Sequence, residues 1–232
     1  KDKIKEFYIP YFYNKKKKLP FVTGKIAISK NNLIYNKKIK KITNKLSNKF
    51  THLLRYKNDT IMISSKTLNI DNPKLNCRLK NMQKFSPIRV VLDNKLEANN
   101  DSYIFKTANK DNTIFIYNEA NKSNIHKFKI KKIQLLKSKI DKYKKFDIKR
   151  IMKKLYKLGC RNILVEGGDD LTQSFLKKKL FNQFYLFKSS KSLSNTNNKK
   201  AFNSFNVLKQ NYKNKFKLNA NFGKDKIILY KR

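Results

Sequence analysis

An apolar run that enters two glycines and then a helical pattern is the most informative stretch of this chain. Residues 163–171 read Ile-Leu-Val-Glu-Gly-Gly-Asp-Asp-Leu. Glycine lets the backbone approach a ligand closely, and a helix N-terminus offers free N–H groups to a phosphate. Taken alone, however, the two glycines are better explained as a tight strand-to-helix turn. Asp169 and Asp170 favour a helix start but bring negative charge to the place where a phosphate would bind.

Short apolar runs recur along the chain and alternate with segments of helical periodicity. Strands are predicted at residues 21–28, 60–64, 88–92, 113–117, 133–136, 162–165 and 184–187, and two more within 216–230. Helices are predicted after Thr43 or Asn44, after Asp147 and over about 169–179, with loops at 30–42 and 191–200. The pattern favours an α/β fold with one domain at 20–232, preceded by a linker or irregular lead-in at 1–19.

Apolar spacing also predicts the buried faces of two helices. The first face consists of Leu46, Phe50, Leu53 and Leu54. The second consists of Ile148, Ile151, Met152, Leu155 and Leu158, and Gly159 closes that helix.

The charge of the chain is strongly positive, with 57 basic and 15 acidic residues and a net charge of +42. Such a balance is typical of proteins that bind nucleic acid or an anionic membrane. However, 51 of the basic residues are Lys and 6 are Arg, and a coding bias toward A/T-only codons explains this excess of Lys equally well. Because Arg is better suited than Lys to bidentate phosphate recognition, the few arginines carry more information than the many lysines.

Several protein classes are disfavoured by missing features. No apolar run approaches the roughly 20 residues of a membrane helix, and no signal peptide opens the chain. Cys77 and Cys160 lie far apart, which disfavours a zinc site or a disulfide framework and fits a reducing cytoplasm. Neither a P-loop nor a G-x-G-x-x-G fingerprint is present. We therefore expect no metal, no membrane and no specific nucleic acid partner.

Two arginines, Arg55 and Arg78, flank the strand predicted at 60–64. Either suits a phosphate or a flat uracil-like group. The alternatives, about equally weighted, are a cation at a helix C-terminus for Arg55 and a surface ion pair for Arg78. Asn94 follows the strand at 88–92, where it presents a polar group at a sheet edge or simply makes a turn. His52 lies inside a predicted helix and is interpreted as structural.

Five motifs in this order resemble one family, the reductase domain of riboflavin biosynthesis, usually the C-terminal half of a bifunctional deaminase/reductase. Residues 20–29 are similar to its Pro-Tyr-Val-x-x-Lys-x-Ala-x-Ser strand, and 42–55 to its Ile-Thr helix that ends in Leu-Arg. Residues 64–78 resemble Gly-x-x-Thr-x-x-x-Asp-x-Pro-x-Leu-x-x-Arg. Residues 87–93 and 166–171 match Pro-x-Arg-Val-Val-Leu-Asp and Glu-Gly-Gly-x-x-Leu. The resemblance covers about residues 20–232.

The resemblance implies a dihydrofolate-reductase-like fold, with a mixed, mostly parallel sheet flanked by helices. It implies NADPH-dependent reduction of 5-amino-6-(5-phosphoribosylamino)uracil to the ribitylamino product, so the partner is a small phosphorylated pyrimidine. The cofactor carries the redox chemistry and the protein supplies position and electrostatics, so no catalytic acid or base is singled out. Whether a deaminase domain precedes Lys1 is left open. The sequence leaves open the choice of NADPH over NADH and whether the chain forms a homo-oligomer.

The resemblance also assigns site residues. Substrate contacts fall on Arg55, Leu75, Arg78 and Glu166. Cofactor contacts fall on Ala27, Thr67, Asp71, Asn94, Gly168, Asp169, Asp170, Leu171, Thr172, Gln173 and Ser174.

The chain departs from the family pattern at several positions. Asn31 stands where the family has Asp, Ile39 replaces a substrate-contacting Ser, and Lys41 replaces an aromatic residue at the cofactor. Ser64 replaces the first Gly of its motif. These departures keep two alternatives open beside the reductase: a diverged reductase acting on another substrate, and a basic nucleic-acid-binding protein.

Overall fold

The computed structural model describes residues 2–35, 42–193 and 200–232. Within these residues, nine strands form one sheet in the order β10-β11-β8-β1-β7-β3-β4-β5-β6, and β2 pairs separately with β9. The strands are β1 (Phe21–Ile28), β2 (Leu33–Tyr35), β3 (Thr60–Ser64), β4 (Ile88–Leu92), β5 (Thr113–Tyr117), β6 (Gln134–Lys137), β7 (Asn162–Glu166), β8 (Gln183–Lys188), β9 (Lys200–Ala201), β10 (Asn214–Lys217) and β11 (Lys226–Lys231).

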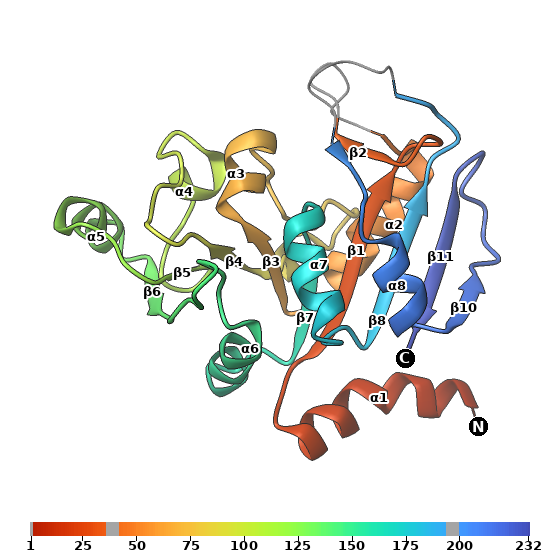
Figure 1. Cartoon of the computed structure of the whole chain (residues 1–232), viewed down its shortest axis with the longest axis horizontal. Coiled ribbons are helices and arrows are strands. Elements are labelled where there is room, and N and C mark those ends of the chain that lie inside the picture. The colour runs from red at the N-terminus through yellow and green to blue at the C-terminus, as the bar shows by residue number, and fades with distance from the viewer. Residues whose placement is uncertain (1, 36–41, 194–199) are drawn as a thin grey trace.

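Helices connect most of these strands (Figure 1). They are α1 (Asp2–Lys17), α2 (Lys45–Tyr56), α3 (Ser65–Asp71), α4 (Tyr103–Lys106), α5 (Lys122–Ile130), α6 (Ile148–Lys157), α7 (Asp169–Lys177) and α8 (Phe205–Asn211), with a short 3-10 turn, η1 (Gln83–Phe85). From β8 through β6 all neighbouring strands are parallel, whereas β11 is antiparallel to both β8 and β10. The expected α/β class with a mixed, mostly parallel sheet flanked by helices is confirmed.

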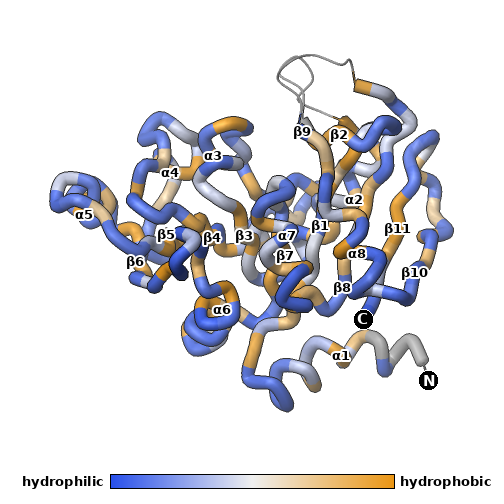
Figure 2. Tube along the Cα trace, viewed as in Figure 1, coloured by the Kyte–Doolittle hydropathy of each residue, from blue (hydrophilic) through white to orange (hydrophobic). Residues whose placement is uncertain are grey.

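Both faces of the sheet are covered, so its central strands are apolar on both sides. In β3, Met62 joins the core that α6, α7 and α8 complete, whereas Ile61 and Ile63 join the core under α2, α3, α4 and α5. Successive side chains of a strand point to opposite faces, and all three are fully buried. Figure 2 shows hydrophobic residues concentrated along these strands. This two-sided burial explains why β3 reads as a continuous apolar run, as parallel strands usually do.

The N-terminal segment corrects one expectation, because residues 2–17 form the helix α1 instead of an irregular lead-in. The helix ends where Asn14 Nδ2 donates hydrogen bonds to the carbonyls of Leu19 and Arg161. Lys is a good helix former, and the run of lysines before Lys18 lies in the last turn. Figure 1 shows α1 across the end of the sheet at which β1 begins.

Two further elements differ from the sequence-based expectation. Residues 65–71, for which no element was predicted, form the helix α3, because the Ser64 hydroxyl caps that helix and accepts the Thr67 N–H. In α2 the buried face is shifted: Leu46 is exposed, whereas the polar Ser47 and Thr51 are buried. Ser47 is buried because its hydroxyl donates to the carboxylate of Asp225 at 2.8 Å.

Short elements lie in the segments predicted to be loops or left unassigned. Strand β2 falls within 30–42, and β9 begins at the last residue of 191–200. Helices α4, α5 and α8 lie in segments for which no element was predicted. These pieces are short, so their periodicity is weak. Leu158 is exposed because α6 ends one residue earlier, and Gly159 then turns the chain at a φ of 94°.

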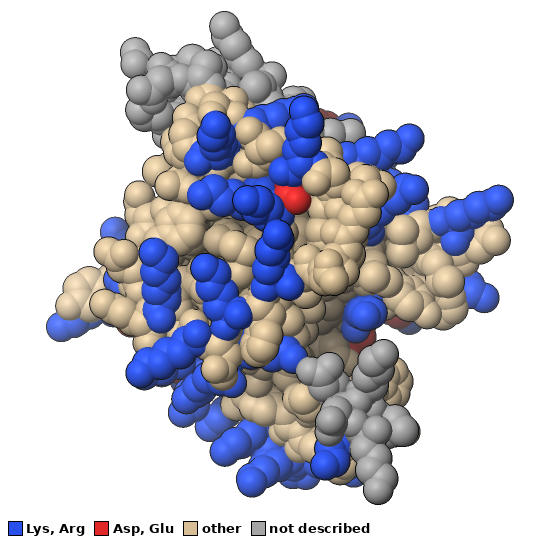
Figure 3. Space-filling model, turned by 90° about the vertical axis from the view of Figure 1, so that its right-hand side faces the viewer, with Lys and Arg blue, Asp and Glu red and all other residues tan. Residues whose placement is uncertain are grey.

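The outer surface carries most of the charge excess. Figure 3 shows one face of the molecule with Lys and Arg side chains scattered over it and few acidic groups beside them. Scattered lysines of this kind solvate a surface and attract polyanions in a salt-dependent manner.

Candidate active site

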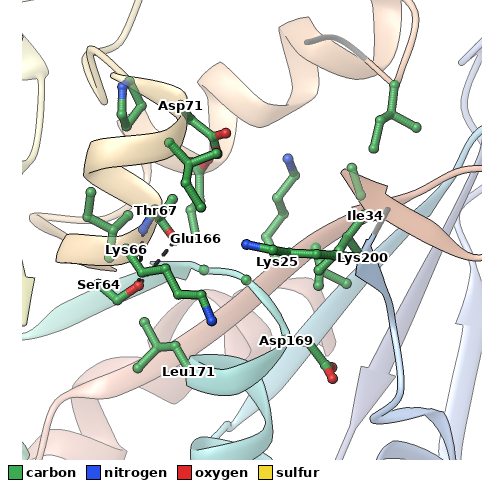
Figure 4. Close-up of a pocket in the computed structure, with 18 of the residues that line it drawn as sticks. Lys25, Ile34, Ser64, Lys66, Thr67, Asp71, Glu166, Asp169, Leu171 and Lys200 are labelled. Atoms are coloured by element: carbon green, nitrogen blue, oxygen red, sulfur yellow. Dashed lines mark hydrogen bonds between the residues drawn. The ribbon is translucent and has the colours of Figure 1, made fainter. Parts of the chain in front are cut away.

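A cavity of about 910 Å³ opens where three neighbouring parallel strands end. The last residues of β1, β3 and β7 reach it, together with the segments that follow β3 and β7 (Figure 4). Ligands of open α/β sheets bind at the carboxyl ends of the strands, and the volume lies in the usual range for small-molecule sites. The cavity is therefore the candidate active site.

A buried ion pair forms the floor of this cavity. Arg55, at the end of α2, donates from Nε and Nη2 to the two carboxylate oxygens of Glu166 at 2.8 and 2.9 Å. Arg55 Nη1 donates to the Asn76 carbonyl at 3.1 Å. Burial alone would raise the pKa of Glu166, but the Arg55 guanidinium outweighs burial and holds that pKa below its usual value. Glu166 is therefore a fixed carboxylate.

Lys25 of β1 is a second cation at the floor, and sequence reasoning did not assign it. Its pairing register with Glu166 on β7 places both residues side by side, and its ammonium lies 4.9 Å from the centre of the Phe187 ring. Burial lowers the pKa of Lys25, although Glu166 partly opposes this. Figure 4 shows the side chain extending into the cavity. Lys25, Arg55 and Glu166 are called the cavity floor below.

The segment between α3 and Arg78 forms one wall. Asn72 ends α3 with a left-handed φ of 42°, and Leu75 is buried with a φ of 56°. A left-handed bulky residue is uncommon and costs conformational energy. The segment is held by His52, whose Nδ1 accepts the backbone N–H of Arg78 at 3.2 Å. Burial and then the nearby Arg55 lower the pKa of His52 to about 4, so it is neutral.

Arg78 itself lies at the open side of the wall. Its side chain is exposed, and Nη1 donates to Asn76 Oδ1 at 2.7 Å. Within the described residues it forms no salt bridge with a carboxylate. Its guanidinium therefore remains available to an anionic ligand, unlike that of Arg55.

The turn between β7 and α7 forms the opposite wall. A Cβ on Gly167 would lie 3.0 Å from Leu171 Cδ2, whereas a Cβ on Gly168 would meet nothing within 4 Å. Asp169 lines the cavity, and its carboxylate accepts the Ser204 hydroxyl at 2.6 Å (Figure 4). Asp170 accepts Lys66 Nζ at 2.8 Å. Both carboxylates at the helix start are therefore engaged by other groups.

Most of the residues that the sequence assigned to a site come together here. The cavity is lined by Arg55, Leu75, Arg78, Glu166, Ala27, Thr67, Asp71, Gly168, Asp169, Asp170 and Leu171. Thr172, Gln173 and Ser174 do not line it, because α7 leads away from the cavity and Thr172 is buried. Asn94 does not line it either: its carbonyl accepts the N–H groups of Asn118 and Glu119 instead.

Sequence reasoning missed several polar residues of the lining. Lys66, Lys74 and Lys200 reach the cavity, as do Thr43 and Asn48. Lys66 was inside a quoted motif, but one lysine among 51 carries no signal of its own. Only the fold shows which of them face inward.

Of three residues that depart from the family pattern, Asn31, Ile39 and Lys41, the structure describes Asn31 alone. Asn31 bridges two loops: its Oδ1 accepts from the Ser29 hydroxyl and the Leu193 N–H, and its Nδ2 donates to the Leu193 carbonyl. It therefore has a structural role outside the cavity lining. Ile39 and Lys41 lie outside the described residues.

Neither a metal-ligand cluster nor a membrane-spanning helix is found in the described residues. Among residues 2–35, 42–193 and 200–232, no three His, Cys, Asp or Glu side chains cluster as metal ligands would. The helices that the structure describes include none with the length and apolarity to cross a membrane.

The mostly parallel sheet and the cavity at its carboxyl edge, which several cationic side chains line, define an α/β domain with one candidate small-molecule site in its described residues. A family model described as the RibD C-terminal domain matches residues 33–227. The chain belongs to that family.

Three known proteins illustrate the similarity. Riboflavin biosynthesis protein RibD of Aquifex aeolicus is 29% identical over 197 residues, covering 82% of this chain and 51% of that protein. The 5-amino-6-(5-phosphoribosylamino)uracil reductase of Buchnera aphidicola from Acyrthosiphon pisum is 28% identical, covering 66% and 75%. The solved structure of the Saccharomyces cerevisiae riboflavin biosynthesis reductase Rib7 superposes with a TM-score of 0.71 at 20% identity, covering 97% and 99%. The chain spans about half the length of the first curated relatives it matches.

Proposed function

We propose that the domain reduces 5-amino-6-(5-phosphoribosylamino)uracil to its ribitylamino product with NADPH. The observation that carries the proposal is the cavity floor. The fixed carboxylate of Glu166 and the half-buried ammonium of Lys25 lie on this floor, and the available guanidinium of Arg78 lies at the open side of the wall of the same cavity. A relative that is a reductase of this substrate covers two thirds of the chain. The mixed sheet of the fold carries the site.

The residues divide the recognition of the substrate between them. Arg78 binds the ribose phosphate, because its guanidinium has no carboxylate partner in the described chain and Arg–phosphate bonds are strong. Arg55 is committed to Glu166 and to the Asn76 carbonyl, so it positions the carboxylate and the wall. Glu166 then accepts hydrogen bonds from the uracil or the sugar with its remaining lone pairs.

The chemistry requires one hydride and one proton. NADPH, which Ala27, Thr67 and Asp71 would help to hold, would supply the hydride that reduces the imine or carbonyl carbon of the opened ribose. Lys25 supplies the proton to the nitrogen or oxygen of that double bond. Burial lowers its pKa, which makes the ammonium a stronger acid than an exposed lysine. Glu166 beside it opposes this shift and favours the charged form.

The cofactor and the setting are part of the same proposal. Ala27, Thr67 and Asp71 and the turn at Gly168 line the cavity and are available to NADPH. Cys77 and Cys160 are buried and unpaired, which fits a reducing cytoplasm. We also propose that a deaminase domain acts on the preceding intermediate, as the resemblance implies.

The test is a turnover assay in which the absorbance of reduced nicotinamide is followed. The purified protein is mixed with NADPH and with substrate made fresh by a separate deaminase. Substrate-dependent loss of NADPH supports the proposal. NADPH binding without turnover points to another substrate, and no NADPH binding contradicts the proposal.

The variant Arg78→Ala tests whether Arg78 binds the ribose phosphate of the substrate. We expect roughly a tenfold to hundredfold loss in kcat/KM, carried mainly by KM, with NADPH affinity unchanged. Arg150→Ala on α6 removes an arginine that does not line the cavity and serves as the matched control. Full turnover in Arg78→Ala would remove the assignment.

A further inference from the structure

Lys66 connects the two walls of the cavity. It is the second residue of α3, which follows β3, and its ammonium reaches Asp170 in the first turn of α7, which follows β7. Because β3 and β7 are neighbouring parallel strands, both helices start at the same edge of the sheet. Figure 4 shows the side chain extending from α3 toward the start of α7. Lys66 and Asp170 are called the cavity rim below.

The rim pair is exposed and easily exchanged. Its N–O distance of 2.8 Å equals that of the floor pair, but 61% of the Lys66 side chain and 83% of the Asp170 side chain are exposed. Exposed Lys–Asp pairs contribute little, since water and salt screen them. A doubly charged phosphate oxygen cluster is a stronger partner for an ammonium than one solvated carboxylate.

The surroundings of the Lys66 ammonium admit such an anion. Gly168 leaves open space beside the first turn of α7, which has no side-chain cap. The Asp169 carboxylate is turned to Ser204 and to the Asn203 N–H. Lys145 and Lys200 also act electrostatically on Asp170. Asp170 is thus the carboxylate that competes with a bound anion for Lys66.

We propose that Lys66 binds a phosphate group of the nicotinamide dinucleotide and that Asp170 is its competing partner in the free protein. The proposal rests on the proposed function, because it names a residue that determines cofactor affinity in that cavity. When the dinucleotide binds, the Lys66 ammonium leaves Asp170 for the phosphate. The pair with Asp170 therefore lowers the affinity for the dinucleotide, but it keeps the Lys66 side chain ordered at the rim of the free protein.

The test is a double-mutant cycle on NADPH affinity, measured by calorimetry on wild type, Lys66→Ala, Asp170→Asn and the double variant. We expect Lys66→Ala to weaken binding about tenfold in the wild-type background, and more, roughly thirtyfold, in the Asp170→Asn background, where no competitor must be displaced. Lys106→Ala is the matched control, because Lys106 forms an equally exposed pair with Asp101 away from the cavity. It should leave the affinity unchanged.

The outcomes separate direct contact from simple charge masking. If Lys66 only shields Asp170, its loss matters only while Asp170 is present, and this result would overturn the proposal. No loss in either background would overturn it too. A loss shared by NADPH and NADH supports contact with the pyrophosphate, and a loss confined to NADPH supports contact with the 2′-phosphate. Wild-type protein that binds neither nucleotide would instead refute the proposed function.

Discussion

Two ion pairs with the same N–O distance of 2.8 Å lie in one cavity, and they differ in exposure. At the floor, the side chains of Arg55 and Glu166 are 9% and 13% exposed, whereas those at the rim are 61% and 83% exposed. Distance therefore says little about energy here. Removal of one partner of a buried ion pair is strongly destabilising, because the other charge stays buried with neither a counter-charge nor water around it. An exposed pair is held loosely and exchanges partners at low cost.

The largest effect should come from breaking the floor pair on one side. Arg55→Met leaves the Glu166 carboxylate buried without its guanidinium, and we expect a loss of about 3 kcal/mol in the free energy of unfolding. Urea denaturation measures this loss. Lys66→Ala at the rim should cost less than about 1 kcal/mol.

The double variant Arg55→Met/Glu166→Leu controls for packing. Because no unpaired charge remains, its stability should lie closer to the wild type than that of Arg55→Met. Equal losses at floor and rim, or a double variant less stable than the single one, would contradict the comparison.

A second effect should appear as a pH dependence that arises at the wall, next to the floor residue Arg55. His52 supports the wall beside Arg55, and burial lowers its pKa to about 4. In the unfolded chain the pKa of His52 is about 6.5. Between about pH 4 and pH 6.5 the unfolded chain therefore binds more protons at this imidazole than the folded chain does. Stability should therefore fall as the pH drops from about 6.5 to about 4, by up to roughly 3 kcal/mol.

His52→Asn tests this assignment, because its side-chain oxygen can accept the Arg78 N–H but does not titrate in this range. We expect its stability to change less with pH than that of the wild type, as measured by urea denaturation at several pH values. His126→Asn, on the exposed side of α5, should keep the wild-type slope. An unchanged slope in His52→Asn would contradict the role of the imidazole.

The difference between floor and rim also explains how far the sequence could predict the site. Strands β1, β3, β4, β5 and β7 were predicted with nearly their observed bounds, since each is an apolar run bounded by polar residues or turns. Arg55 and Glu166 were assigned through motifs at separate places in the chain. Their mutual pairing was not predictable, because it arises only when α2 ends against β7.

Side-chain direction was the part that the sequence did not carry. Lys25 and Lys66 are two lysines among 51, and composition cannot say which of them turn inward. The buried polar side of α2 was missed for a related reason: apolar spacing predicts burial by hydrophobicity, whereas Ser47 and Thr51 are buried through tertiary contacts. Short elements such as β2 and β9 form through pairing with each other, which local periodicity does not reveal.

The smallest expected effect is a difference in thermal stability between alanine variants of Gly167 and Gly168, the two glycines of the turn between β7 and α7. In Gly167→Ala the new methyl would lie 3.0–3.3 Å from three atoms of Leu171, which must shift, so we expect a loss of about 1 kcal/mol and a Tm lower by about 2–4 °C. In Gly168→Ala the methyl enters open space at a φ of −69°, and the Tm should change by less than about 2 °C. Thermal unfolding of both variants is the measurement. Both glycines line the cavity, but only the methyl of Gly168→Ala enters open space, so this variant should weaken NADPH binding without a comparable loss of stability. A Gly168→Ala protein that is destabilised as much as Gly167→Ala would show that the turn is packed on both sides, and the rim would then be as rigid as the floor.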